Sequence, residues 1–200
     1  IQLTIDSPWP SRSGGDIRNA FVASSARAVG PLHIISFGAA DSSATAFDIS
    51  ASHIPSFSEM VPWHRHDPLL RTMIQLAAKD LQFVEKEIRR YSPDVAILEG
   101  VGVCAALPLV RQMGVPIILD MHNIESVLYR SIRRKSSATK YLKDVLFGKS
   151  RWRSAGDFDR DTSLQADETW VTSSRDRSLL LNMGGADSVV VPNPIPDESL

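Results

Sequence analysis

The sequence predicts an α/β fold, a doubly wound and mostly parallel sheet of about seven strands with helices on both faces. Two observations lead to this. Short runs rich in β-branched residues alternate with helical stretches along the whole chain. Most of these runs are apolar at consecutive positions, which is typical of strands buried on both faces. The expected strands are Gln2–Ile5, His33–Phe37, Asp48–Ala51, Val95–Glu99, Ile117–Met121, Thr169–Thr172 and Ser188–Val191.

Helices are predicted between these strands from apolar positions that recur every three or four residues. Glycine and proline mark where they end, as at Gly30-Pro31 and Gly184-Gly185. A serine N-cap is predicted at the start of the last helix. The expected helices are Asp16–Val29, Leu69–Tyr91, Leu107–Met113 and Ser174–Met183.

The composition restricts the function classes. A formal net charge of -1 argues against a general nucleic-acid binder. The single cysteine, Cys104, cannot form an intrachain disulfide, and no base accompanies it in sequence, so it is interpreted as a packing residue. We find no apolar run long enough to span a bilayer. Both ends lie beside strand-like runs, so we expect a piece of a longer protein.

The chain after the first predicted strand is a candidate phosphate-binding turn. Gly14 and Gly15 can adopt positive φ and allow close approach of a ligand. The start of the following helix favours anions, and Arg18 could add donors to a phosphate. A plain tight turn with a surface arginine is the alternative. The pattern is not G-x-G-x-x-G, so no nicotinamide dinucleotide fingerprint is present.

Polar residues follow two further strands, where ligands bind in such sheets. Glu99 ends one strand and could bind a hydroxyl-bearing ligand or cap the next helix. The segment "DMHNIES" places Asp120, His122, Asn123 and Glu125 at the exit of a buried strand. His122 could hydrogen-bond a substrate; the alternative is that it only packs while Asn123 or Ser126 caps the helix. "WHRH", with His64 and His66, lacks further ligands at metal-site spacing, and no metal is expected.

A basic amphipathic segment extends from Arg130 to Arg153. It has nine basic residues and one acidic residue, Asp144, with apolar and aromatic residues between them. Such a segment can lie on anionic lipid head groups, or it can be a solvated helix whose apolar side faces the sheet. The residues chosen for membrane contact are Arg133, Arg134, Lys135, Lys140 and Lys143.

Five motifs, in order, resemble the N-terminal domain of GT-B fold glycosyltransferases, in particular the large retaining family 4. They are "PWPSRSGGDIR", "PDVAILEG", "GVPIILDMHNIES", "ADETWVTSSRD" and "GGADSVVVPNPIP". The resemblance implies a Rossmann-like domain over residues 1–192 and the start of an interdomain linker over 193–200. The second, nucleotide-sugar-binding domain is not in this sequence, so we expect the fragment alone to be inactive.

The resemblance also implies roles for individual residues. Gly14, Gly15 and Arg18 would face the diphosphate of a UDP- or GDP-sugar, and His122 would lie near the transferred sugar as the catalytic residue. The acceptor, a glycan or a lipid-linked molecule in polysaccharide biosynthesis, would contact Glu99, Asn123, Glu125 and Ser173. No cofactor or metal is implied. The expected location is cytoplasmic, peripheral on the inner face of the membrane.

Two other functions fit the residues. One is a non-catalytic, flavodoxin-like ligand-binding domain, although such domains usually carry a carboxylate cluster where Asp6 stands alone. The other is half of a sugar-nucleotide epimerase of the same fold. A second α/β domain in the parent reading frame would favour the transferase.

Overall fold

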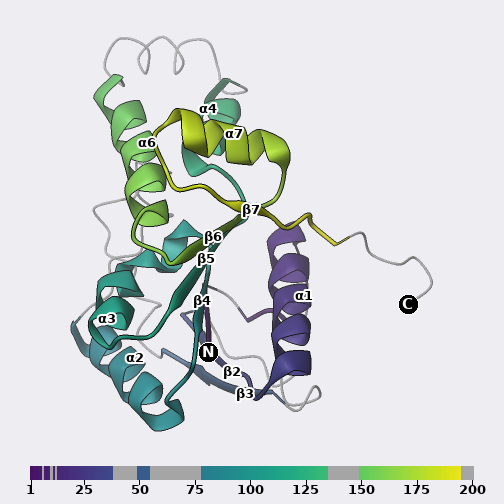
Figure 1. Cartoon of the computed structure of the whole chain (residues 1–200), viewed down its shortest axis with the longest axis vertical. Coiled ribbons are helices and arrows are strands. Elements are labelled where there is room, and N and C mark those ends of the chain that lie inside the picture. Colours follow the sequence, from purple (N-terminus) through teal and green to yellow (C-terminus); the bar gives the residue numbers. More distant parts are fainter. Residues whose placement is uncertain are drawn as a thin grey trace.

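The computed structural model describes residues 1–5, 7–9, 11, 13–37, 49–54, 78–134 and 149–194. Its centre is a seven-stranded sheet in which every paired strand is parallel, in the order β3-β2-β1-β4-β5-β6-β7 (Figure 1). The predicted fold class is confirmed. The strands are β1 Gln2–Thr4, β2 His33–Ser36, β3 Ser50–His53, β4 Ala96–Glu99, β5 Ile117–Met121, β6 Glu168–Val171 and β7 Val189–Val190.

Helices cover both faces of the sheet, with α1 on one side and α2 and α3 on the other (Figure 1). A 3₁₀ helix, η3 (Val101–Ala106), leads from β4 into α3. The α-helices are α1 Gly14–Val29, α2 Ala78–Tyr91, α3 Leu107–Gln112, α4 Glu125–Arg134, α6 Lys149–Ser163 and α7 Ser174–Asn182. The structure describes only the backbone in two parts of these helices. One is α4 from Tyr129 onward, with the exception of Ser131, and the other is α6 up to Ala155.

The consecutive apolar residues of the strands pack into two cores. On β2, Ile35 joins the large core with Leu3 and Leu98, whereas its neighbour Ile34 joins a smaller core with Ala23 of α1. Successive side chains of a strand point to opposite faces of the sheet. Helices cover both faces of the sheet, so apolar side chains are buried on both faces.

Strand β3 differs from the prediction. It begins at Ser50 instead of Asp48, because the register pairs His33 of β2 with Ser50. Among the described strands it lies at the edge of the sheet and pairs with β2, and its residues are mostly exposed. Asp48 itself, residues 69–77 of the second predicted helix and the "WHRH" segment lie outside the described residues.

The strand order reverses between β1 and β4, the two central neighbours. In open parallel sheets, ligands bind at this reversal, outside the carboxyl ends of the strands. The sheet thus indicates where a functional site belongs: beside Thr4, Glu99 and Met121, the last residues of β1, β4 and β5. Within the described part of the chain, no helix is long and apolar enough to cross a membrane.

Candidate functional site

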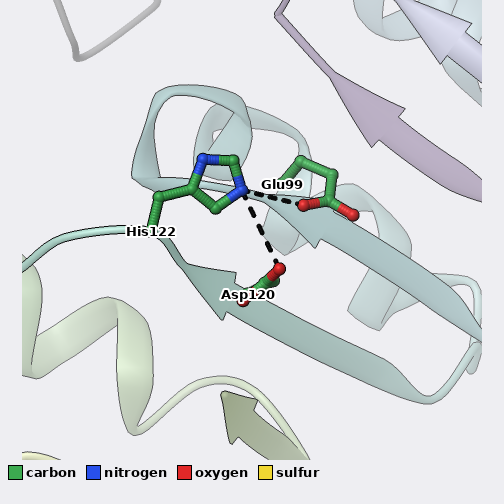
Figure 2. A group of neighbouring side chains, drawn as sticks. All are labelled: Glu99, Asp120 and His122. Carbon is green, nitrogen blue, oxygen red and sulfur yellow. Dashed lines mark hydrogen bonds and ion pairs between the residues drawn. The ribbon is translucent and has the colours of Figure 1, made fainter. Parts of the chain in front are cut away.

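Glu99, Asp120 and His122 meet at the carboxyl ends of β4 and β5 (Figure 2). The parallel register places Glu99 directly beside Asp120. Asp120 shares a sheet face with Glu99, and His122 follows β5 immediately. Glycine at position 100 then turns the chain away with φ 77°, a value that favours glycine.

His122 forms a hydrogen-bonded pair with Glu99. Its Nε2 atom lies 2.9 Å from Glu99 Oε2 and 3.8 Å from Asp120 Oδ2. The other ring nitrogen, Nδ1, points away from both carboxylates (Figure 2). The imidazole side chain is 19% exposed, whereas both carboxylates are fully buried. Glu99 thus holds Nε2 of His122, whereas Nδ1 lies on the side of the ring that faces away from the carboxylates.

The pKa of Glu99 is raised to about 7, mainly by burial and also by the nearby Asp120 carboxylate, while the hydrogen bond to His122 opposes the rise. Gln2 supports the same carboxyl group from β1, donating its Nε2 amide to Glu99 Oε1 at 2.7 Å. Near neutral pH the Glu99 and His122 pair can therefore share a proton. When Glu99 is ionised, it accepts from Nε2–H and leaves the lone pair on Nδ1.

Arg18 neutralises Asp120. Its guanidinium binds both carboxylate oxygens, with Nε 2.8 Å from Oδ2, and both side chains are essentially inaccessible. Its remaining nitrogen, Nη1, donates to the carbonyl of Val191 at 2.8 Å and to Asn193 Oδ1 at 3.1 Å. The predicted diphosphate role of Arg18 is therefore corrected. Its donors are used inside the protein, and burial keeps them from a ligand.

Gly14 and Gly15 are the first residues of helix α1 and not part of a loop. Ser13 caps the helix, its Oγ accepting from the backbone N–H of Asp16 at 3.2 Å. Neither glycine has positive φ, which corrects the predicted reason for the pair. A Cβ atom at Gly15 would lie 3.7 Å from His122 Nδ1. The absence of a side chain there keeps the space beside Nδ1 open.

Asn19 completes the group and was missed by the sequence analysis. In the amide orientation that satisfies both ends, its oxygen accepts from Thr4 Oγ1 at 2.8 Å. Its nitrogen can then donate to Glu99 Oε2 at 3.1 Å and to the carbonyl of Gly15 at 3.2 Å, which leaves the Nε2–H of His122 free to donate to Glu99. Arg18, Asn19, Val22 and Ala23 form the buried face of α1. In the sequence, Arg18 and Asn19 stand at the start of a helix face that is otherwise apolar, and this pattern could have indicated that both are buried.

The other predicted acceptor residues are not members of the group formed by Glu99, Asp120 and His122. Asn123 is exposed. Glu125 begins α4, where burial, together with the nearby Asp159, raises its pKa to about 7. Asp159 of α6 accepts from the backbone N–H of Ser126 at 2.9 Å, so it supplies the helix cap expected from Asn123 or Ser126. Ser173 caps α7, and its Oγ also donates to Asp176.

Cys104 is buried in the large core. Burial raises the pKa of its thiol to about 12, as the interpretation of a packing residue requires. Of the five residues chosen for membrane contact, the structure describes the backbone of Arg133 and Arg134, which end α4. Lys135, Lys140 and Lys143 lie outside the described residues.

Glu99, Asp120 and His122 offer ligand atoms within 4.8 Å of one another, a spacing that could hold a metal ion. Both oxygens of Asp120 are already bound by Arg18, which supplies the positive charge that a cation would bring. The donor set therefore fits a proton-sharing pair beside a neutralised carboxylate better than a metal site.

No family model and no curated protein sequence matches this chain. Several solved structures, however, are similar to it in fold. HepE of Anabaena, in complex with UDP and glucose, is 12% identical with a TM-score of 0.59; the match covers 97% of this chain and 44% of HepE. UGT2 of Phytolacca americana, complexed with UDP-2-fluoro-glucose and pterostilbene, is 11% identical with a TM-score of 0.57, over 98% of this chain and 55% of UGT2. This chain thus spans about half the length of the structures it matches.

This chain shares its α/β fold with these two structures. At this level of identity the likeness concerns the fold. The roles of individual residues must be argued from the geometry of this site.

Proposed function

We propose that this chain is the acceptor-side domain of a sugar-nucleotide-dependent glycosyltransferase similar to family 4. The pairing of His122 with buried Glu99, at the point where the strand order reverses, carries the proposal. This is the position at which α/β sheets bind ligands. The likeness to HepE, solved with UDP and glucose, supports a UDP- or GDP-sugar donor.

The reaction joins an acceptor oxygen to the anomeric carbon of the donor sugar. The bond from that carbon to the diphosphate breaks, the nucleoside diphosphate leaves with the electron pair, and a leaving phosphate oxygen takes up the proton of the acceptor hydroxyl. In the proposed site, His122 Nδ1 accepts a hydrogen bond from a hydroxyl of the transferred sugar. Glu99 holds the imidazole in the tautomer that makes this possible, by accepting from Nε2–H.

The leaving diphosphate needs positive charge near it in the transition state. The start of α1 can supply this, because its first backbone N–H groups and its dipole favour anions. Gly14 and Gly15 allow a phosphate to approach these groups without a side chain between them. Arg18 takes no part in this contact.

Residues 1–192 form the proposed domain, and 193–200 begin a linker to a nucleotide-sugar-binding domain. A hexosyl group would pass to a glycan or lipid-linked acceptor, with Asn123, Glu125 and Ser173 beside the acceptor. The test uses the full-length protein. UDP- or GDP-sugars should raise its melting temperature and be turned over, while residues 1–200 alone should give no turnover. Absence of both stabilisation and turnover in the full-length protein would contradict the proposal.

The basic segment is proposed to dock the enzyme on the anionic inner face of the membrane. Co-sedimentation with liposomes tests this. Binding should require anionic lipid and should weaken when glutamine replaces Arg133, Arg134, Lys135, Lys140 and Lys143. Glutamine at the exposed Lys86 and Arg90 of α2 is the matched control. Equal binding to neutral and anionic vesicles, or none, would contradict membrane docking.

A further inference from the structure

Arg18 connects two parts of the molecule that are far apart in sequence. It lies on the first turns of α1, yet its guanidinium contacts Asp120 on β5 and the segment just after β7. The contacts to Val191 and Asn193 span 173 and 175 residues. A buried arginine is uncommon and is normally paired. Here all the contacts are internal, so the residue acts inside the fold.

The charges around His122 show what Arg18 can control. Glu99 faces the imidazole from β4, Asp120 from β5, and Glu125 lies near it on α4. Arg18 is the cation that binds Asp120. With Asp120 neutralised, the proton of the site is shared between His122 and Glu99. Without Arg18, an unpaired carboxylate would lie 3.8 Å from His122 Nε2 and favour the protonated imidazole.

We propose that Arg18 is a positioning residue that couples the chain segment leaving β7 to the protonation and orientation of His122. It fixes Asp120 with one side of its guanidinium and holds Val191 and Asn193 with the other. A displacement of this segment therefore changes the hold on Asp120. This inference rests on the proposed function for its catalytic consequence, but the coupling itself can be measured without turnover.

The experiment uses the full-length protein and three variants. Arg18→Lys keeps the charge but cannot bridge Asp120 and the segment after β7 together. Arg18→Met with Asp120→Asn removes both charges, which avoids leaving Asp120 unpaired. Arg89→Gln is the control, because Arg89 binds Glu85 in an exposed pair on α2. The histidine ring signals are followed by NMR against pH, and amide exchange is followed at Val190, Val191 and Asn193, since Pro192 has no amide hydrogen.

In Arg18→Lys, whose single ammonium cannot bind both oxygens of Asp120, the pH dependence of the His122 ring signals should shift upward, and the acid limb of kcat/KM should move with it. The decrease in kcat should be larger than the increase in the KM for the donor. The double variant should return this pH dependence toward wild type while amide exchange at Val190, Val191 and Asn193 increases. Wild-type titration and exchange in both variants would overturn the coupling. A coupling that is observed in a wild-type protein with neither sugar-nucleotide binding nor turnover would overturn the proposed function alone.

Discussion

The imidazole Nε2 atom of His122 lies 2.9 Å from a carboxylate oxygen of Glu99, and that carboxyl group is buried at the end of β4. Burial raises its pKa into the range in which the pair gains and loses a proton near neutrality. The proposed chemistry depends on this relationship, because the state of Glu99 decides which nitrogen of His122 carries the proton.

Glu99→Gln should lower kcat of the full-length enzyme by roughly 10²-fold, a typical effect of losing acid–base support. The amide is similar in shape but cannot accept a proton from the imidazole. Steady-state kinetics measure the effect, and Glu85→Gln on the surface of α2 is the control. A Glu99→Gln enzyme as active as this control would show that the pair only packs.

Glu99 and Glu125 should each contribute a fall in stability as the pH rises from about 4.5 to about 7. Burial raises the folded-state pKa of both Glu99 and Glu125 from 4.5 to about 7. In this window the unfolded chain releases protons that the folded protein retains, so a higher pH favours unfolding. Urea denaturation at several pH values measures this. Glu99→Gln should make the decrease in the free energy of unfolding over this pH range smaller by about 1–3 kcal/mol. Identical pH profiles for wild type and variant would refute the assignment.

The space at Gly15 should tolerate one methyl group and no more. A Cβ atom there would lie 3.6 Å from Ser13 Oγ and 3.7 Å from His122 Nδ1, which are ordinary contacts. Gly15→Ala should therefore fold normally and gain about 0.5–1 kcal/mol from better helix propensity. Gly15→Leu should crowd Nδ1 and raise the donor KM while the melting temperature changes little. Unchanged donor kinetics in Gly15→Leu would return this position to an ordinary helix start.

The thiol of Cys104 should be unreactive in the folded protein. It is the only cysteine in this chain, it is buried, and its pKa is raised to about 12. A thiol-specific chromogenic reagent should label residues 1–200 slowly at pH 8 and completely in denaturant. Rapid labelling of the native chain would place Cys104 at an accessible site instead.

The sequence was sufficient to predict the sheet, because strands covered on both faces leave a clear record of consecutive apolar residues. It also located His122 at a strand exit. The partners of His122 depended on the register of β4 and β5, which sets Glu99 beside Asp120. Arg18 was assigned to a phosphate because its carboxylate partner is 102 positions away and no local pattern joins them.

The most direct test is sugar transfer by full-length His122→Gln. We predict that the wild-type protein transfers sugar from a UDP- or GDP-sugar. The variant should fold and bind the nucleotide with little change, but transfer sugar roughly 10²-fold more slowly. Wild-type turnover by His122→Gln would contradict the central role of this histidine.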